Sequence, residues 1–446
     1  MTLKHDFDNF VSNWQSFFFQ PISPVAMGVF RILVGIVLLQ FLLIHLLADW
    51  SLYYGNHAII PIEDSIGKYW RHEPYFDAML LLPPGETWRW YFFLGTCLFG
   101  FMMTIGLFTR VSTVLVFVGL TSLHSHFLLN LNSGDNYLRL CCFFLAFSNA
   151  GDALSVDRLL KAVQEDWRIS GLRAPLSAPW AQRMIQLQIA IAYGHTWFCK
   201  IAGDEWNNGM AVYYASRYDD ITRFQIPYLL DNLWTIKILT WGTLLIELLL
   251  FTLIWWRPAR YWVLLAGLAL HIGIEWTMNL PMFEWLFMFT YILFIYPEDL
   301  ERFWHKVQNF VRENIFKPAS LYFDGDCIVC VRAVGLIHHL DIFAVVKLVD
   351  FRRVEALEGA GFADRLEKEI LLKTASGSIE GGFKAFRWMT GRLPLLMILW
   401  PILHVPLVSN IGEAVYNLVA ANRYTILSGS CEHEQCAPVA SGSQDK

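Results

Sequence analysis

Charged side chains are scarce in this chain of 446 residues. Asp, Glu, Lys and Arg make up 16% of the sequence, whereas an ordinary soluble domain contains about 25%, and 55% of the residues are hydrophobic. The net charge of −5 and the lack of any basic tract give no electrostatic footprint for nucleic acid. The composition therefore predicts a membrane protein that has the lipid bilayer, and no nucleic acid, as its partner.

Cysteine is too sparse for the disulfide framework of a small secreted protein. The sequence has eight cysteines, and four of them lie in apolar runs where a reduced, buried thiol is the usual state. A cleavable signal is not expected either. The first apolar run, 24–48, is long enough to span a bilayer, and no basic segment precedes it.

Apolar runs of about 20 residues predict a polytopic α-helical membrane bundle. Lys and Arg crowd residues 151–183 and the stretch after 300, whereas the joints near 132 and 279 have none. By the positive-inside rule, we expect a multi-pass protein of the bacterial inner membrane with both termini in the cytoplasm. The eight candidate spans are 24–48, 89–108, 111–131, 136–150, 183–202, 234–256, 260–277 and 280–296.

A small α/β domain is expected after the bundle. Residues 298–317 form the pattern of an amphipathic helix that leaves the membrane. Strands are predicted at 320–323 and 342–351 with a helix between them, and a strand and hairpin within 369–382. The expected division is thus a membrane domain at 1–297, a linker helix at 298–317 and a second domain at 318–446.

One further apolar segment, 393–408, invites interpretation as a ninth span. It has only 16 residues and contains Pro401 and Pro406, which interrupt a helix. We therefore expect two short buried helices there.

The sequence DGDCIVC places Cys327 and Cys330 two residues apart, after a strand and at the start of a helix. Free N–H groups and the helix dipole lower the pKa of a thiol at such a position, and the helical spacing brings the second thiol to the first. Asp324 and Asp326 oppose this lowering. Two other interpretations stay open: a structural cysteine pair, and a zinc site completed by Cys431, His433 and Cys436.

The second domain carries the motifs YFDGDCIVC, SGSIEGGFKAF, RLPLL and AVYNLVAANRY. Through them, residues 319–427 resemble the DCC family of thiol-disulfide oxidoreductases, which implies a thioredoxin-like fold. The resemblance implies that Cys327 is the nucleophile and Cys330 the resolving thiol. It also implies a protein thiol or disulfide as partner.

Polar residues within the expected spans are candidate site residues, because each is costly in lipid. Arg31 shares a helix face with two glycines and is expected to reach a carboxylate where two helices approach closely, with Glu247 as one candidate for a structural charge pair. His271 and Glu275 are four residues apart, which permits a hydrogen-bonded pair, although His271 alone could be a satisfied core histidine.

Tyr193, Thr196 and Lys200 form a polar stripe on one face of the fifth span. Snorkelling of the Lys200 ammonium to the interface is one explanation. Chemistry is the other, because an apolar site disfavours the charged form of lysine and so favours a base.

Scattered motifs over about residues 25–297 decide what is expected of this half: FRILVGIVLL, LYYGNHAIIP, GLFTRVSTVL, NSGDNYLRL, LHIGIEWTMNLPMFEW and the block from Tyr193 to Ala215. They resemble the HTTM family, the transmembrane domain shared with vitamin K-dependent gamma-carboxylase. The matching lysine of the carboxylase is proposed as the base that deprotonates vitamin K hydroquinone. The resemblance implies that Lys200 is catalytic and that a quinone or hydroquinone binds nearby.

The candidate cofactor-binding residues around Lys200 are Tyr193, His271, Arg31 and Trp206. Departures from the carboxylase limit the transfer of its activity: Thr196-Trp197 replaces an Ala-Gly step, Asp135 stands where the carboxylase has a histidine, and the large extracytoplasmic domain is absent.

The leading prediction is an integral membrane oxidoreductase that performs thiol-disulfide exchange, coupled to a quinone-like ligand in the bundle and using no metal. One alternative is a hydroquinone-dependent, carboxylase-like enzyme with Lys200 as base. The other is a non-enzymatic membrane factor for maturation or export of a secreted peptide.

Overall fold

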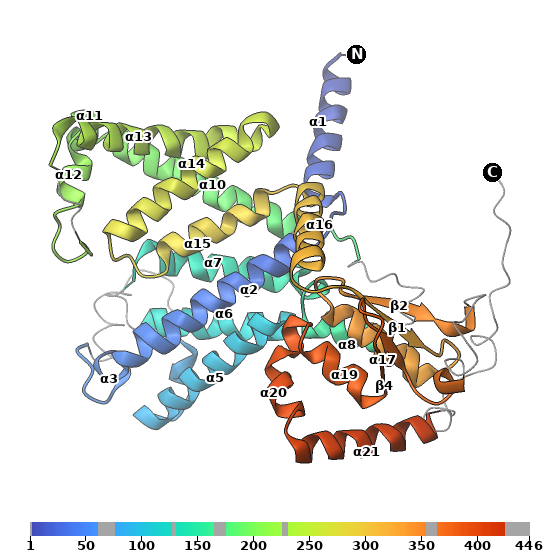
Figure 1. Ribbon diagram of the computed structural model, residues 1–446. Coiled ribbons are helices and arrows are strands. Elements are labelled where there is room, and N and C mark those ends of the chain that lie inside the picture. Colours follow the sequence, from blue (N-terminus) through green and yellow to red (C-terminus); the bar gives the residue numbers. More distant parts are fainter. Residues whose placement is uncertain are drawn as a thin grey trace. The chain divides into compact units, whose positions relative to one another are not determined.

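The protein is described by a computed structural model that covers residues 2–60, 76–126, 131–164, 175–224, 231–353 and 364–423. The chain forms two compact units (Figure 1). Helices make up the first unit, which comprises Met1–Arg158 and Ala174–Pro297. The second unit comprises Leu159–Arg173 and Glu298–Lys446 and contains a mixed four-stranded sheet.

Helices occupy each place where the sequence predicts a span, although the last of them has only eight residues. They are α2 (Val25–Gln40, continued by a π-helical turn Phe41–Leu46), α5 (Glu86–Ile105), α6 (Thr109–His126), α7 (Ser133–Phe147), α10 (Trp180–Ile201), α13 (Leu233–Thr252), α14 (Arg257–Thr277) and α15 (Phe283–Thr290). The other helices of this part are α1 (Thr2–Phe19), α3 (Trp50–Tyr54), α11 (Asp204–Asn207) and α12 (Ala211–Ala215). Helix α8 (Val156–Gln164) begins in the first unit and continues into the second.

Eight membrane spans are not confirmed. Among the helices of the described ranges, two are long and apolar enough to cross a membrane, Val25–Leu46 and Leu233–Trp255, and a bent pair near the C-terminus would make a third. The remaining helices are shorter or more polar. On α10, for example, Gln182 and Gln186 both turn inward and donate to the carbonyl oxygen of Leu293.

Helix α2 packs against α5 through small residues. A Cβ atom at Gly35 would lie 2.2 Å from Oγ1 of Thr104 on α5, so only glycine permits this approach. Gly28 likewise faces the carbonyl oxygen of Ala153, which would lie 2.7 Å from an added Cβ. The close helix approach expected around Arg31 is therefore confirmed.

The sheet of the second unit has the strand order β2-β1-β3-β4. Strands β1 and β2 are parallel, with Leu321 opposite Leu348, and β3 runs antiparallel to β1, with Leu321 opposite Leu372. The strand and hairpin predictions are confirmed. The strands are β1 (Ala319–Phe323), β2 (Val346–Asp350), β3 (Leu371–Lys373) and β4 (Ile379–Gly381).

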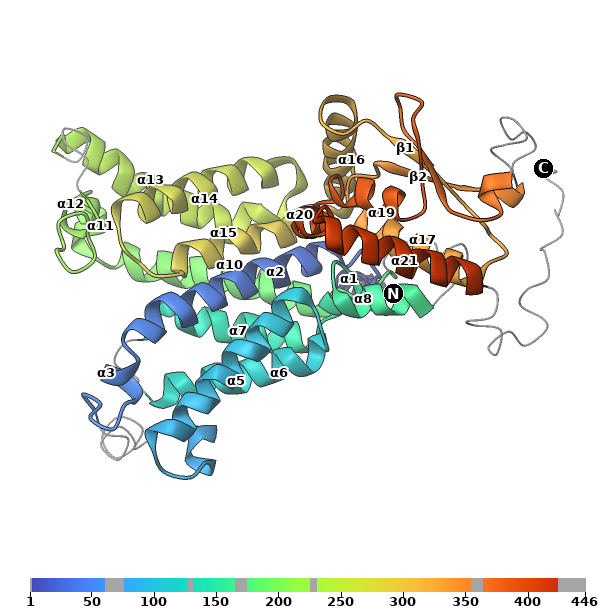
Figure 2. The same ribbon diagram turned by 60° about the horizontal axis from the view of Figure 1, so that its bottom comes forward.

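Helices lie beside this sheet (Figure 2). Alternate residues of β1, among them Leu321 and Phe323, are buried with Val334 of α17 and Met389 of α19 in one hydrophobic core. In the chain, α17 connects the two parallel strands. The helices are α16 (Pro297–Asn314), α17 (Ile328–Leu340), α19 (Phe383–Thr390), α20 (Trp400–Leu403) and α21 (Pro406–Asn422).

The expectation of two buried helices at 393–408 is wrong. A 3-10 helix (Pro394–Leu399), α20 and the first turn of α21 occupy this segment, but most of its side chains point outward. Ile398 is 77% exposed and Leu407 is 70% exposed. The physical reason is that α17 and α19 already fill the core beside the short strands, so that Leu393 alone of this segment is fully buried.

Candidate active site

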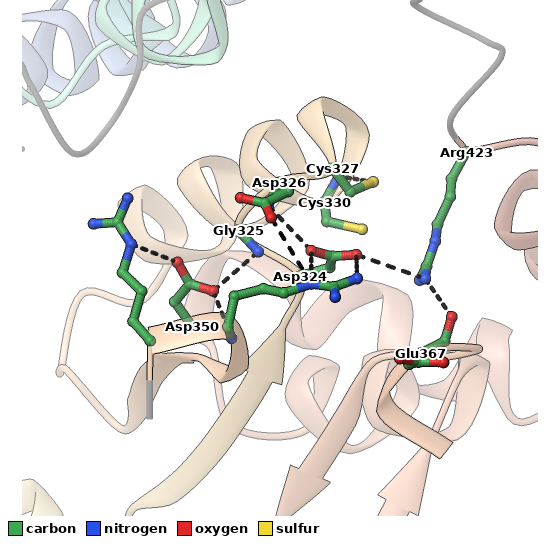
Figure 3. Close-up of polar contacts among 10 residues, drawn as sticks. Asp324, Gly325, Asp326, Cys327, Cys330, Asp350, Glu367 and Arg423 are labelled. Atoms are coloured by element: carbon green, nitrogen blue, oxygen red, sulfur yellow. Dashed lines mark hydrogen bonds and ion pairs between the residues drawn. The ribbon is translucent and has the colours of Figure 1, made fainter. Parts of the chain in front are cut away.

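Cys327 and Cys330 lie where β1 leads into α17 (Figure 3). Cys327 is the N-cap residue of α17, and its sulfur accepts a hydrogen bond from the backbone N–H of Cys330 at 3.3 Å. Both thiols are free and nearly buried, with 1% and 5% of their surface exposed. The position at the helix N-terminus is the one that the sequence predicts.

The two thiols differ in acidity. The hydrogen bond from the Cys330 thiol lowers the pKa of Cys327 to about 7, helped by the Cys330 N–H group and the positive charge of Arg423. These effects outweigh burial and the negative charge of Asp324. The pKa of Cys330 is raised far above its usual value, because it shares its proton with Cys327 and is buried. Cys327 is therefore the more acidic thiol of the pair, as an attacking thiol requires.

Asp324 forms a buried charge cluster directly beside the thiols. Its carboxylate, with 1% of the residue exposed, accepts two hydrogen bonds of 3.1 Å from Nε and Nη2 of Arg352. Nη2 of Arg423 lies 3.8 Å from the same carboxylate. Two guanidinium groups thus offset the charge of Asp324. The side chain of Asp326 is 76% exposed, so water screens its charge, and the two aspartates oppose thiol ionisation less than the sequence suggests.

The turn before Cys327 is held by the neighbouring strand. The N–H of Gly325 donates to Oδ1 of Asp350 at the end of β2, at 3.1 Å. A Cβ atom at position 325 would lie 2.0 Å from Oδ2 of Asp350, so a side chain has no room here. Because the carboxyl ends of the parallel strands β1 and β2 meet at one edge, the DGD turn and Asp350 come together although they are far apart in sequence.

Arg423 is a functional residue that sequence reasoning missed. It caps the end of α21, is 5% exposed and donates to the backbone carbonyl of Glu367 (Figure 3). Its guanidinium lies near both this carbonyl oxygen and the carboxylate of Asp324, where its charge acts on Cys327. The only sequence signal was the closing motif AVYNLVAANRY, which contains this arginine but does not indicate its role.

Replacing Arg423 is expected to make Cys327 less acidic. In Arg423→Gln, loss of the positive charge should raise the pKa of Cys327 from about 7 by up to about one unit. The rate of iodoacetamide alkylation at Cys327, measured against pH, should then reach half its maximum at a higher pH than in the wild type. Arg392→Gln is the control, because that guanidinium lies over the ring of Trp388, 3.8 Å from its centroid. Equal profiles for all three proteins would contradict the assignment.

Lys200 is engaged by two residues of the helical unit. Its Nζ donates to Oε1 of Glu247 on α13 and lies 4.8 Å from the ring centroid of Trp206. Thr196 Oγ1 lies 3.5 Å from the other Glu247 oxygen. Lys200 and Trp206 thus lie in contact, and Glu247 is the partner of Lys200 and not of Arg31.

Tyr193 belongs to a second, buried polar cluster. Its hydroxyl lies 2.6 Å from Nε2 of His271 and 2.6 Å from the hydroxyl of Tyr291. Nδ1 of His271 in turn hydrogen-bonds Oε2 of Glu284, which is fully buried. Tyr291 and Glu284 are further residues that sequence reasoning missed, since nothing in the pattern indicated that α15 faces α10 and α14.

Two expected pairings are corrected by these contacts. Glu275 does not pair with His271: it accepts a hydrogen bond of 3.1 Å from Nη2 of Arg223. Arg31 does not reach a carboxylate. Its guanidinium donates to the carbonyl oxygens of Ala150 and Leu154, each at 2.6 Å, and so fastens that turn to α2.

The remaining candidates concern metals. Cys431, His433 and Cys436, which would complete a zinc site, lie outside the described residues. Within the described ranges, there is no group of three or more His, Cys, Asp or Glu side chains placed to hold a metal ion.

Comparison with known proteins assigns both halves of the chain. The family model for the HTTM domain matches residues 19–298, which is more than half of the sequence. The chain belongs to the HTTM family. The model for the DCC1-like thiol-disulfide oxidoreductases matches residues 321–428 and includes both cysteines of the candidate site. The resemblance of each half, and the fusion of the two domains, are confirmed.

Among curated proteins, a match is found to a Bacillus subtilis (strain 168) protein named "Uncharacterized protein YitO". It is 27% identical over 124 residues, which cover 26% of this chain and 39% of that protein. The match thus spans about two fifths of its length. No solved structure matches. The HTTM match and the apolar helices together support a membrane protein with an oxidoreductase-type domain.

We expect strong energetic coupling between Lys200 and Glu247, the partly buried ion pair of the HTTM domain. Lys200→Met or Glu247→Gln alone should lower the free energy of unfolding by about 3 kcal/mol, because each leaves the other charge without its partner in a mostly buried place. The double variant should recover much of this loss. Thermal unfolding of the full chain in detergent measures the cycle, and Arg217→Met with Asp231→Asn is the control, because the side chain of Asp231 is 67% exposed whereas that of Glu247 is 8% exposed. Additive losses would contradict the coupling.

Proposed function

We propose that this HTTM protein is a membrane-bound thiol-disulfide oxidoreductase in which Cys327 and Cys330 of the DCC1-like domain are the reacting pair. The observation that carries the proposal is the unequal pair of thiols at the N-terminus of α17: Cys327 has a pKa of about 7 and a hydrogen-bonded neighbour. A Cys-x-x-Cys motif at the turn of a βαβ unit is typical of thioredoxin-like redox domains.

The proposed reaction has two steps. The Cys327 thiolate attacks one sulfur of a disulfide R–S–S–R′, forms a mixed disulfide with R–S and releases R′–S⁻, which takes up a proton. The Cys330 thiol loses its proton, attacks Sγ of Cys327 and releases R–S⁻. The net result is transfer of two electrons from the cysteine pair to the substrate. A cytoplasmic side for this domain, as the positive charges after residue 300 favour, suits this reducing direction.

The test is catalysis by the full chain in detergent micelles. A fluorescent glutathione disulfide should be cleaved with dithiothreitol as reductant, at a rate that rises through pH 7 as Cys327 ionises. A rate no greater than that of dithiothreitol alone, over this pH range, would rule the proposal out.

A second candidate function is coupling of the thiols to a quinone in the HTTM domain. The cluster of Tyr193, His271 and Glu284 favours it, because phenol, imidazole and carboxylate groups can pass protons to a quinone oxygen in a site away from water. The exchange balances: dithiol oxidation releases two electrons and two protons, and reduction of a quinone to a hydroquinone consumes both. We propose Lys200 and Trp206 as further residues at this ligand.

The coupling is tested by the redox state of Cys327 and Cys330. Alkylation mass shifts in membranes should show oxidation on addition of menaquinone in the wild type and in Lys237→Ala, which removes a second lysine near a tryptophan ring. The shift should be absent in Lys200→Ala. Thiols that ignore menaquinone in all three proteins would leave only the thiol-exchange activity.

A further inference from the structure

The C-terminal helices of the DCC1-like domain carry many exposed apolar side chains. Residues 394–422 contain one charged side chain, Glu413, in 29 positions. A water-facing segment of this length would contain about seven. Yet its largest side chains point outward: Ile398, Trp400, Ile402, Leu407, Ile411 and Leu418 are all exposed.

Helix α21 has two distinct faces. Its inner face packs on the domain: a Cβ atom at Gly412 would lie 2.2 Å from the ring of Phe383, and Tyr416 OH accepts the N–H of Ile370 at 3.0 Å. Leu407, Ile411 and Leu418 are spaced by four and seven residues and lie on the opposite face. An outward face made of Leu and Ile is the reverse of a water-facing helix.

Composition indicates what covers this surface. The helix pair Pro394–Leu403 and Pro406–Asn422 meets the length and hydropathy conditions of a membrane span when taken together, but the pair is bent by 110°. Such a bend prevents a straight crossing, whereas each arm can lie flat in the headgroup region with its apolar face toward the acyl chains.

The neighbouring residues have the charge that a membrane surface requires. Between 383 and 393 there are three cations, Lys384, Arg387 and Arg392, and no carboxylate. Arg392 lies over the ring of Trp388, and such cation-aromatic pairs suit the interface between water and lipid. In addition, only 22 residues separate the HTTM match, which ends at 298, from the DCC1-like match, which begins at 321. The domain is therefore tethered beside a bilayer.

We propose that the face of α21 formed by Leu407, Ile411 and Leu418 docks into the headgroup region of a lipid bilayer. The occupant is lipid because the segment is membrane-like in hydropathy, is flanked by cations that attract anionic headgroups and is held close to a membrane by the HTTM domain. Docking places a second, independent membrane contact on the domain that carries the thiols.

The test uses the full chain in nanodiscs of phosphatidylcholine and phosphatidylglycerol. The photo-crosslinking residue p-benzoylphenylalanine replaces Leu407 or Leu418, and intact-protein mass spectrometry identifies the adduct. We expect phospholipid adducts at both positions, about tenfold more than at Asn417 on the polar side of the same helix. Leu245 on α13, in an apolar span, is the positive control.

Three outcomes would overturn the proposal. Adducts to peptides of the HTTM domain would mean that the face is an interface within the chain, and adducts to a second copy would mean a dimer. Equal, low lipid labelling at positions 407, 418 and 417, with normal labelling at 245, would mean a surface in water. The lipid composition supplies a second readout: removing phosphatidylglycerol from the nanodiscs should lower the adduct yield at Leu407 but not at Leu245.

Discussion

Cys327→Ser is expected to abolish thiol-disulfide exchange, with the rate falling to that of the uncatalysed reaction. The serine hydroxyl cannot replace a thiolate as nucleophile, and the neighbouring Cys330 has a raised pKa. Cys330→Ser should behave differently. It keeps the attacking Cys327 but lacks the resolving thiol, so a mixed disulfide with the substrate should accumulate. Mass spectrometry of the full chain after reaction with glutathione disulfide distinguishes the two variants.

Cys199→Ser is the matched control for these cysteine variants. Cys199 is exposed and lies beside His195 on α10, in the HTTM domain. Its replacement should leave the exchange rate unchanged. An active Cys327→Ser protein, or a mixed disulfide that forms on Cys330, would show that the roles of the two thiols are assigned wrongly.

The largest loss of stability is expected for Asp324→Ala. This change leaves the guanidinium of Arg423, which is 5% exposed, without its buried counterion and removes both hydrogen bonds from Arg352. Breaking one side of a buried ion pair costs about 3 to 5 kcal/mol. Labelling of the buried Cys330 thiol in increasing urea reports unfolding of the DCC1-like domain, so the midpoint should move to a much lower urea concentration.

Asp326→Ala is the control two residues away. The side chain of Asp326 is 76% exposed, and its carboxylate comes no closer than 4.0 Å to Nε of Arg352. Its effect should stay within about 0.5 kcal/mol. Equal effects of both variants would mean that the cluster around Asp324 does not stabilise the domain.

The local structure around the thiols could be predicted from the sequence. The strand at Ala319–Phe323, the turn and the N-cap position of Cys327 all follow from residues adjacent in the chain. The charges that tune the thiol could not be predicted. Arg352 and Arg423 come from the ends of β2 and α21, and only the folded sheet brings them to Asp324. Periodicity shows that a helix has a face, but it does not show which partner meets that face.

The same limit explains the errors in the HTTM domain. Sequence spacing suggested His271 with Glu275, because local pairs are the only ones that spacing reveals, yet His271 meets Glu284 on the next helix. Arg31 was expected to find a carboxylate, but a guanidinium has several donors, and backbone carbonyls at a turn accept hydrogen bonds from its Nη1 and Nη2. Glu247 was expected to meet Arg31, but it accepts a hydrogen bond from Lys200.

The most direct test of the central claim is a redox titration of Cys327 and Cys330 in the full chain. The protein is equilibrated in glutathione buffers of known potential, alkylated and measured by mass. We predict that both thiols disappear together along a two-electron curve, with a midpoint between about −270 and −120 mV, the range of known dithiol oxidoreductases. Two results would contradict the claim that the thiols form a redox couple. Both thiols could remain open to alkylation at every potential, or one could oxidise without the other.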